Sequence, residues 1–301
     1  MKPSNITLVM PCYNVADTLP AVLHAVDQLD PTPARFLCVD DGSTDGTRDI
    51  LRSHDSAELI EHDTNSGLGV TMNTALSHTE TSLFAKIDAD IVVPADWLTN
   101  MLAAYEESDS ALVQGRFIEQ ETTRADQWRA KYPSPHFPVE PRRNKPINGG
   151  GILAETEALR AIEGYDEQFR RAFDDIDLME RLIEAGYDIY YDPSVCATHI
   201  RTDTVREVLH TEWAYQNDPR TISKPTSLTD VIDRIPYHFD KSARYIYRDC
   251  RERKPARLGL SLLRFPALVA YDLAHVHSSS WSRFGSTSSE STVDQPWENQ
   301  D

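Results

Sequence analysis

Short apolar runs alternate with amphipathic segments over the first hundred residues, and this alternation constrains the fold more than any other feature of the sequence. Each run has the length of a buried strand, and each amphipathic segment repeats its apolar residues at helical spacing. The expected strands are residues 6–10, 35–39, 58–62 and 82–87. Strands that alternate with helices predict an α/β fold with a mostly parallel central sheet and helices on both faces.

A pair of aspartates, Asp88 and Asp90, closes the fourth expected strand. Open α/β sheets bind ligands at the carboxyl ends of their strands, where exposed loops stand on a rigid scaffold. In an extended tip the two side chains point apart, so one carboxylate can reach a ribose or a bound water while the other holds a hard divalent cation. A plain polar turn is the alternative, because acidic turns are common in a protein this acidic.

Two more polar loops follow the first two expected strands, at the same edge of the sheet. One is Pro11-Cys12-Tyr13-Asn14, and the other begins with Asp40-Asp41-Gly42. Glycine lets the backbone approach a ligand closely, although Asp, Ser and Gly also make turns and cap helices. Three polar loops at one edge indicate a nucleotide lying across it, with Asp41 facing the base, Asp88 the ribose and Asp90 a metal.

The charge balance argues against nucleic acid as a partner. The 301 residues include 48 acidic and 30 basic ones, a formal charge of −18, whereas phosphate binding needs concentrated cations. Only seven of the basic residues are Lys. A diffuse acidic excess with little Lys is typical of a high-salt cytoplasm, so we expect a halophilic protein, as in halophilic archaea.

Cysteine usage and hydropathy favour a cytoplasmic location. The four cysteines are widely separated and form no C-x-x-C pair, so neither a disulfide framework nor a cysteine zinc site is expected. The first apolar run begins at Ile6, which leaves no room for a secretory signal. The most apolar later stretch, residues 258–276, contains Arg264, Pro266 and Asp272 and is not expected to span a bilayer.

Short motifs follow one another in order through the first two thirds of the chain. They are Pro11-Cys12-Tyr13-Asn14, residues 39–47, Asn65-Ser66-Gly67-Leu68-Gly69, Asp88-Ala89-Asp90, Gly149-Gly150-Gly151, residues 164–167, residues 174–178, Gly186-Tyr187, Pro193 and His199. This ordered series is far more specific than any single motif. The chain resembles family 2 of the inverting glycosyltransferases, which have the GT-A fold.

The resemblance implies a nucleotide-sugar site at the strand ends, for a uridine or guanosine diphosphate sugar. The early loops hold the nucleobase and ribose in that family, the first aspartate of the Asp-x-Asp pair lies near the ribose, and the glycine loop runs beside the donor sugar. The positions so implied are Pro11, Tyr13, Asn14, Asp41, Gly67, Asp88, Gly149 and Gly150.

The resemblance also implies a metal ion and a general base. Asp90 would bind Mn²⁺ or Mg²⁺, with His199 as a further contact, and the cation would stabilise the leaving diphosphate. Asp175 would take the proton of the acceptor hydroxyl, with Asp174 second, although the family more often has Glu at position 174. Structural roles stay open as well, since acidic residues favour helix N-termini and a lone His is more often structural.

We expect a GT-A catalytic domain over residues 1–201, with a nucleotide-binding half at about 1–116 and an acceptor half at about 117–201. A polar, Pro-rich connection between Phe117 and Ile147 would line the acceptor side. A helical extension, residues 202–276, includes a stretch that can lie in a membrane interface or pack as a buried helix pair. A disordered Ser-rich tail, residues 277–301, follows.

The predicted activity is metal-dependent, inverting transfer of a single hexosyl group to an acceptor hydroxyl. Processive relatives carry a Gln-x-x-Arg-Trp motif, which is absent. By analogy, the acceptor would be a saccharide on a polyprenyl carrier, as in surface-glycan or protein-glycosylation pathways at the inner face of the membrane. A polyprenyl-phosphate sugar synthase is an alternative. Such synthases usually continue after the metal pair with a sequence of the type Asp-Leu-Gln-His-Pro-Pro, whereas residues 91–95 here are Ile-Val-Val-Pro-Ala, which counts against this alternative. A non-catalytic nucleotide-sugar-binding protein is another alternative. The presence of Asp174 and Asp175 argues against it, because a binding protein needs no catalytic base.

Overall fold

The computed structural model describes residues 5–132, 137–147, 151–169, 173–216 and 224–284. The chain divides into two compact units. The first comprises Met1–Gln120 and Pro135–Arg201, and the second comprises Glu121–Ser134 and Thr202–Asp301. The first is α/β and the second is helical, as the sequence predicts.

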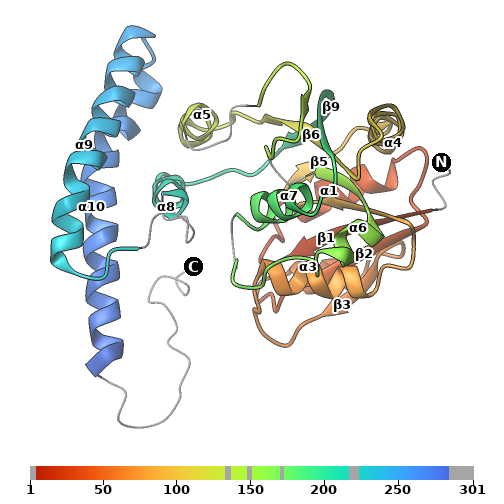
Figure 1. Cartoon of the computed structure of the whole chain (residues 1–301). Helices are drawn as coiled ribbons and strands as arrows, with labels where there is room; N and C mark the ends of the chain where they lie inside the picture. The colour runs from red at the N-terminus through yellow and green to blue at the C-terminus, as the bar shows by residue number, and fades with distance from the viewer. Residues whose placement is uncertain (1–4, 133–136, 148–150, 170–172, 217–223, 285–301) are drawn as a thin grey trace. The chain divides into compact units, whose positions relative to one another are not determined.

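One mixed sheet forms the centre of the first unit (Figure 1). Its strands are β1 (Ile6–Cys12), β2 (Arg35–Asp40), β3 (Glu58–Glu61), β4 (Leu83–Ile87), β5 (Ile91–Val92), β6 (Leu112–Glu119), β7 (Arg142–Arg143), β8 (Gly151–Glu155) and β9 (Ile189–His199). Their order is β3-β2-β1-β4-β8-β6-β9-β5, and β7 pairs with β9 off this path. Since β8 is antiparallel to both β4 and β6, while β6 is parallel to β9, strands β1, β2, β3, β4, β6 and β9 all end at one edge.

Helices cover both faces of this sheet. They are α1 (Leu19–Asp27), α2 (Thr47–Arg52), α3 (Leu68–Ser77), α4 (Trp97–Ser108), α6 (Thr156–Ala161) and α7 (Asp174–Glu184). One core packs α1, α2 and α4 on the face that includes Leu83, Ala85 and Ile87, and the other packs α3, α6 and α7 on the face that includes Phe84. Because side chains alternate along a strand, Lys86 points to the α3 and α7 face.

The second unit consists of helices α5 (Arg124–Lys131), α8 (Val205–Tyr215), α9 (Leu228–Arg251) and α10 (Pro255–Phe284). Capping boxes begin α5, α8 and α9 at Thr123, Thr204 and Ser227. A short turn joins helices α9 and α10, which lie side by side as a hairpin (Figure 1). Within the described ranges, none of the helices combines the length and the apolar character needed to cross a membrane.

Strand β1 is longer than predicted, so Pro11 and Cys12 are not in a loop. The strand pairs with β2 as far as Cys12 opposite Asp40, but with β4 only as far as Val9 opposite Lys86. Beyond Val9 the missing N–H of proline therefore interrupts no ladder with β4.

Strand β9 runs past Pro193, although proline is rare inside strands. The strand continues to His199. Its register with β6 shifts between Gln114 and Arg116, which pair with Tyr191 and Cys196. The intervening residues of β9 form an irregularity that accommodates a proline without ending the strand.

Two further segments contain more secondary structure than expected. Between Phe117 and Ile147 the structure has the end of β6, helix α5 and strand β7, and α5 groups with the second unit. Helix α10 continues to Phe284, past the start of the expected tail, and residues 285–301 lie outside the described range.

Candidate functional site

The sheet topology brings together side chains that the sequence places far apart. Asp41 follows β2, Asp88 and Asp90 follow β4, and His199 ends β9. These strands run in the same direction, so all four residues lie at the carboxyl edge of the sheet. The predicted convergence of polar loops is therefore present.

Asp90, His199 and Glu119 form a hydrogen-bonded chain at this edge. Strand β5 pairs with β9 so that Ile91 lies opposite His199. His199 Nε2 is 3.1 Å from Asp90 Oδ2, and His199 Nδ1 is 2.9 Å from Glu119 Oε2. Burial opposes the charged imidazole, but the two carboxylates outweigh it and raise the pKa of His199 to about 10.

Lys86 is a buried cation beneath the Asp-x-Asp pair. Its side chain is 4% exposed, and its Nζ lies 2.7 Å from Asp88 Oδ1. Burial opposes its charge, but Asp88 and Asp174 outweigh that effect and hold the pKa of Lys86 above its usual value. The negative charge of Asp88 is therefore already paired with the positive charge of Lys86.

Asp174 and Asp175 begin helix α7 in different environments. Asp174 is buried, and its Oδ2 has no hydrogen-bond partner among the described residues. Burial, reinforced by the negative charges of Asp175 and Asp88 and opposed by Lys86, raises the pKa of Asp174 to about 7. Asp175 is half-buried, and its Oδ1 accepts the N–H of Ile176 at 2.8 Å.

The Asp41 carboxylate fastens the loop that begins α3. Asp41 Oδ1 accepts from Ser66 N and pairs with His62 Nδ1, and Asp41 Oδ2 accepts from Gly67 N, each at 2.8 Å. A carboxylate has about four lone-pair sites, so about one acceptor position is left for a ligand. The predicted contact of Asp41 with a base stays a prediction.

Asn14 joins the first two loops. Its backbone has a φ of 50°, its Oδ1 accepts the N–H of Thr44 at 2.8 Å, and its own N–H donates to Ser43 Oγ at 2.9 Å. Tyr13, the neighbour of Asn14, is 40% exposed. The loop thus offers an exposed aromatic ring beside a fixed asparagine, while Pro11 lies within β1.

Helix α3 carries the segment that precedes α7. Gly69 N donates to Phe169 O at 3.3 Å, and a Cβ at Gly69 would lie 2.7 Å from Asp166 O. The Asn73 side chain accepts from Tyr165 N and donates to Tyr165 O, both at 2.8 Å. The start of α3 and the segment before α7 are therefore packed against each other.

The predicted glycines have different outcomes. Gly67 has a φ of 99°, which residues other than glycine rarely adopt. Gly149 and Gly150 lie outside the described residues. Gly151 begins β8 opposite Ile87, at the same edge as Asp88.

Lys86, Glu119 and His62 are not among the residues predicted from the sequence. Lys86 had a signal, because it is a charged residue inside an expected buried strand, where an unpaired charge is costly. Glu119 and His62 carried none, since each is joined to its partner only by the sheet topology.

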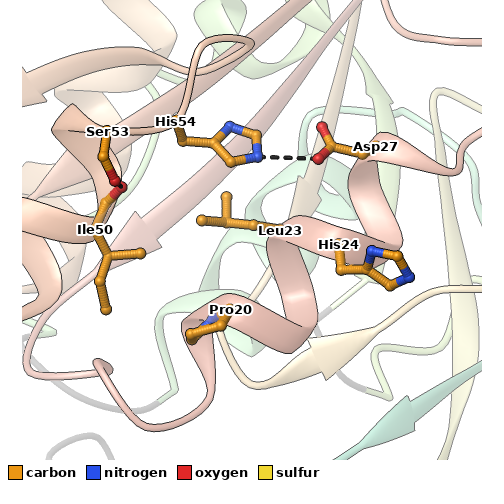
Figure 2. Close-up of a pocket in the computed structure, with 7 residues that line it drawn as sticks. All are labelled: Pro20, Leu23, His24, Asp27, Ile50, Ser53 and His54. Carbon is orange, nitrogen blue, oxygen red and sulfur yellow. Dashed lines mark hydrogen bonds and ion pairs between the residues drawn. The ribbon is translucent and has the colours of Figure 1, made fainter.

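A hollow of about 260 Å³ lies elsewhere, over α1 and α2 (Figure 2). Its apolar floor includes Leu23 and Ile50, and His54 Nε2 is 3.2 Å from Asp27 Oδ2 beside it. None of the predicted site residues lines this hollow. The strand-end site is instead defined by converging polar side chains.

The described residues contain no group of three or more His, Cys, Asp or Glu side chains arranged around a metal position. Asp90 Oδ2 and His199 Nε2 lie 3.1 Å apart, and both can bind a metal once the ion has displaced the Nε2 proton. The ligands of an octahedral ion with bonds of about 2.1 Å are themselves about 3 Å apart. The pair therefore fits two adjacent positions around a divalent cation, with Glu119 orienting the imidazole from behind.

The profile of the family described as Glycosyl transferase family 2 matches residues 7–161. The chain belongs to this glycosyltransferase family. The matched residues include the early loops, Lys86 and the Asp-x-Asp pair, and they end before α7 and His199. Membership of glycosyltransferase family 2, which the motif series predicts, is thus confirmed.

Curated relatives of this family 2 glycosyltransferase align over part of their length. The pre-mycofactocin glycosyltransferase of Mycobacterium tuberculosis is 26% identical over 215 residues, which are 67% of this chain and 44% of the relative. The succinoglycan biosynthesis protein ExoA of Rhizobium meliloti is 28% identical over 196 residues, 61% of this chain and 59% of the relative. The chain thus spans less than half of the first relative.

Solved structures share the fold at lower identity. The mannosyltransferase PcManGT from Pyrobaculum calidifontis, in complex with GDP-Man and Mn²⁺, has a TM-score of 0.55 and 18% identity, over 93% of this chain and 88% of that one. TarS 1–349 of S. aureus, in complex with UDP, has a TM-score of 0.52 and 16% identity, over 96% and 94%. These likenesses show that the family 2 glycosyltransferase has a GT-A-like fold.

Proposed function

We propose that this family 2 glycosyltransferase transfers one hexosyl group, with inversion and with a divalent metal, from a nucleoside diphosphate sugar to an acceptor hydroxyl. The observation that carries the proposal is the convergence of Asp88, Asp90 and His199 at the strand edge, with Asp174 close enough to couple electrostatically to Asp88. The complexes of fold neighbours with GDP-Man and with UDP support a nucleotide-sugar donor.

Asp90 and His199 would hold Mn²⁺ or Mg²⁺. The bound cation would supply positive charge that stabilises the leaving diphosphate. Such ions in nucleotide sites are commonly held by one or two carboxylates, with substrate phosphates and waters as the other ligands. A pair of protein donors is therefore sufficient here, and Glu119 fixes the ring of His199.

The donor nucleotide would lie over the early loops. Tyr13 presents an exposed ring, and Asp41 retains about one acceptor position, which suits an imide or amide N–H of a base. Asp88 would receive the ribose hydroxyls while Lys86 holds its other side. Asn14 and Gly67 would act by fixing loop shape, since their hydrogen bonds join one loop to another.

Asp175 would be the general base. It is half-buried, whereas Asp174 is buried and interacts electrostatically with Lys86, so an acceptor hydroxyl reaches Asp175 more readily. A carboxylate at this position can take the acceptor proton as the sugar carbon is attacked from the face opposite the diphosphate. Asp174 would tune the local charge beside it.

The acceptor would be a saccharide, carried on a lipid in a surface-glycan or protein-glycosylation pathway. The names of the relatives refer to glycosyl transfer in pre-mycofactocin and to succinoglycan biosynthesis. Those names span different acceptors, so the choice of a lipid-linked saccharide needs a direct comparison of free and lipid-linked acceptors.

The test is nucleoside diphosphate release from a panel of uridine and guanosine diphosphate sugars, with and without Mn²⁺ and with free and polyprenyl-linked saccharides. Asp175→Asn should lower turnover by about 100-fold or more. Asp90→Ala should abolish metal-dependent turnover, and Asp55→Asn, an exposed aspartate, serves as the matched control. Nuclear magnetic resonance of the product anomer reports inversion. Full activity of Asp175→Asn, or a retained anomer, would refute the mechanism.

A further inference from the structure

One face of helix α9 exposes a row of large apolar side chains. Leu228, Ile232, Ile235 and Phe239 are 62%, 63%, 36% and 61% exposed. Their spacing of four, three and four residues places them on a single side of the helix. Scattered surface leucines are ordinary, but a continuous row of this length marks an interaction surface.

Helix α10 has an exposed surface without charge. Between Leu258 and Val276 its only Asp, Glu, Lys or Arg residues are Arg264 and Asp272, and both are 0% exposed. Leu262, at 55%, is among the large apolar side chains exposed in this stretch. A chain in which 26% of residues are charged therefore presents about 27 Å of helix surface with no such charged group on it.

The two buried charges of α10 are fully engaged inside the second unit. Arg264 Nη2 donates to Glu212 Oε1 at 2.8 Å, and Asp272 Oδ1 accepts from Trp213 Nε1 at 2.7 Å. His238 Nε2 lies 2.8 Å from Asp272 Oδ2. Over this stretch helix α10 thus keeps its charged groups inside and apolar side chains outside, the reverse of a surface helix in water.

The rows on the two helices belong to one surface. The rings of Phe239 and Phe265 meet edge to face, with centroids 5.7 Å apart. Phe265 is half-buried, and Leu262 and Val269 flank it at helical spacing. These residues form one surface, which we call the apolar face. It consists of Leu228, Ile232, Ile235 and Phe239 of α9 and Leu262, Phe265 and Val269 of α10.

The last turn of α9 and the residues that join it to α10, together called the basic turn, carry exposed positive charge. Arg248, Arg251, Arg253 and Lys254 are all exposed within seven residues. The acidic residues nearby are paired: Asp249 is buried and Glu252 meets Arg257. In a chain with a net charge of −18, this concentration of positive charge at one end of the hairpin that carries the apolar face is a second, independent feature.

We infer that the apolar face of the α9–α10 hairpin lies in the interface of an anionic lipid membrane, with the basic turn against the headgroups. A helix with one apolar side and adjacent basic residues binds in the plane of a bilayer, and anionic lipids attract each nearby Lys or Arg. A second copy would cover the apolar side, but it would leave the basic turn without a specific partner. The inference does not depend on the proposed function.

Flotation of the full chain with vesicles tests this inference. The vesicles are phosphatidylcholine alone, or phosphatidylcholine with about 30 mol% phosphatidylglycerol. The wild type should float with the anionic vesicles and much less with the neutral ones. Leu262→Asp and Ile232→Asp should each weaken binding about tenfold or more. Val139→Asp, at an apolar position that is 76% exposed in the first unit, should leave binding unchanged.

The charge part has its own variants. Arg251→Glu with Arg253→Glu should weaken binding to the anionic vesicles about tenfold or more and leave the weak binding to neutral vesicles unchanged. Arg124→Glu, an exposed position on α5, is the control. Circular dichroism confirms that each variant is folded.

Three results would overturn the inference. The first is a folded wild type that stays in the soluble fraction with anionic vesicles, and the second is flotation of the apolar-face variants equal to that of the wild type. The third is a dimer in lipid-free buffer, detected by light scattering, that Leu262→Asp separates. That result would make a second copy the occupant of the apolar face.

Discussion

Replacement of Lys86 by methionine removes the buried cation and keeps most of the volume of its stem. At 2.7 Å and an effective dielectric constant of about 20, the attraction between Lys86 Nζ and Asp88 Oδ1 is about 6 kcal/mol before solvent screening. The Asp88 side chain is 36% exposed, which reduces that figure, while the loss of one partner from a buried pair typically costs about 3–5 kcal/mol. We expect Lys86→Met to lower the free energy of unfolding by about 3 kcal/mol at pH 8.

The cost should depend on pH through Asp174. The pKa of Asp174 is about 7 in the folded protein even though Lys86 lowers it, so the loss of Lys86 raises it further. A carboxyl group whose folded pKa exceeds its unfolded value of 3.8 destabilises the fold as the pH rises from the unfolded toward the folded pKa. At pH 5 Asp174 is protonated in both folded proteins, and the cost of Lys86→Met should fall to about 1–2 kcal/mol.

Urea unfolding at pH 5 and pH 8, followed by circular dichroism, measures both values. Lys145→Met, at an exposed position, is the matched control and should change stability by less than about 0.5 kcal/mol. Adding Asp174→Asn to Lys86→Met should recover part of the loss at pH 8, because one uncompensated carboxylate is removed. An equal loss of stability at the two pH values, or no recovery in the double variant, would show that Lys86 and Asp174 do not interact electrostatically.

Three further predictions concern the same unit. Asp174→Asn alone should flatten the stability profile between pH 4 and pH 7 and stabilise the protein at pH 8 by about 2 kcal/mol, since the unfolded-to-folded rise in pKa is removed; an unchanged urea-unfolding profile would contradict this. Asp41→Ala should cost about 3 kcal/mol and expose the loop at Gly67 to proteolysis, because three hydrogen bonds are lost, whereas uncut loops would argue that the carboxylate is dispensable. Gly69→Ala should lower the thermal midpoint by several degrees, because its Cβ would clash with backbone, while Gly46→Ala, with only a 3.7 Å side-chain contact, should not; equal midpoints would refute the close approach.

Most of the first unit could be predicted from local pattern. The first four strands are present near the expected residues because each is a buried apolar run with clear boundaries. The ends of β1 and β9 could not be predicted, since Pro11 and Pro193 are tolerated only because of what the neighbouring strands do beside them. That information lies in the sheet pairing and not in the local sequence.

The candidate site shows the same division. Asp88, Asp90 and His199 could be selected in advance because they belong to an ordered series of motifs. Glu119 could not, because it comes 80 residues before His199 in the sequence and meets it only through the parallel pairing of β6 and β9. Asp174 Oδ2, which has no hydrogen-bond partner among residues whose structure is described, likewise reflects burial, and a sequence motif does not show burial.

The hydrogen bonds of Asp41 have a consequence for the rates at which the proposed nucleotide-sugar donor binds and dissociates. Loops that must be ordered by a ligand lose conformational entropy at the moment of binding, and this loss weakens affinity. Here Ser66, Gly67 and His62 are already held by one buried carboxylate before any ligand arrives. A nucleotide that binds there, as proposed, would meet a preorganised surface, and differences in affinity between donors should be expressed mainly in their dissociation rates.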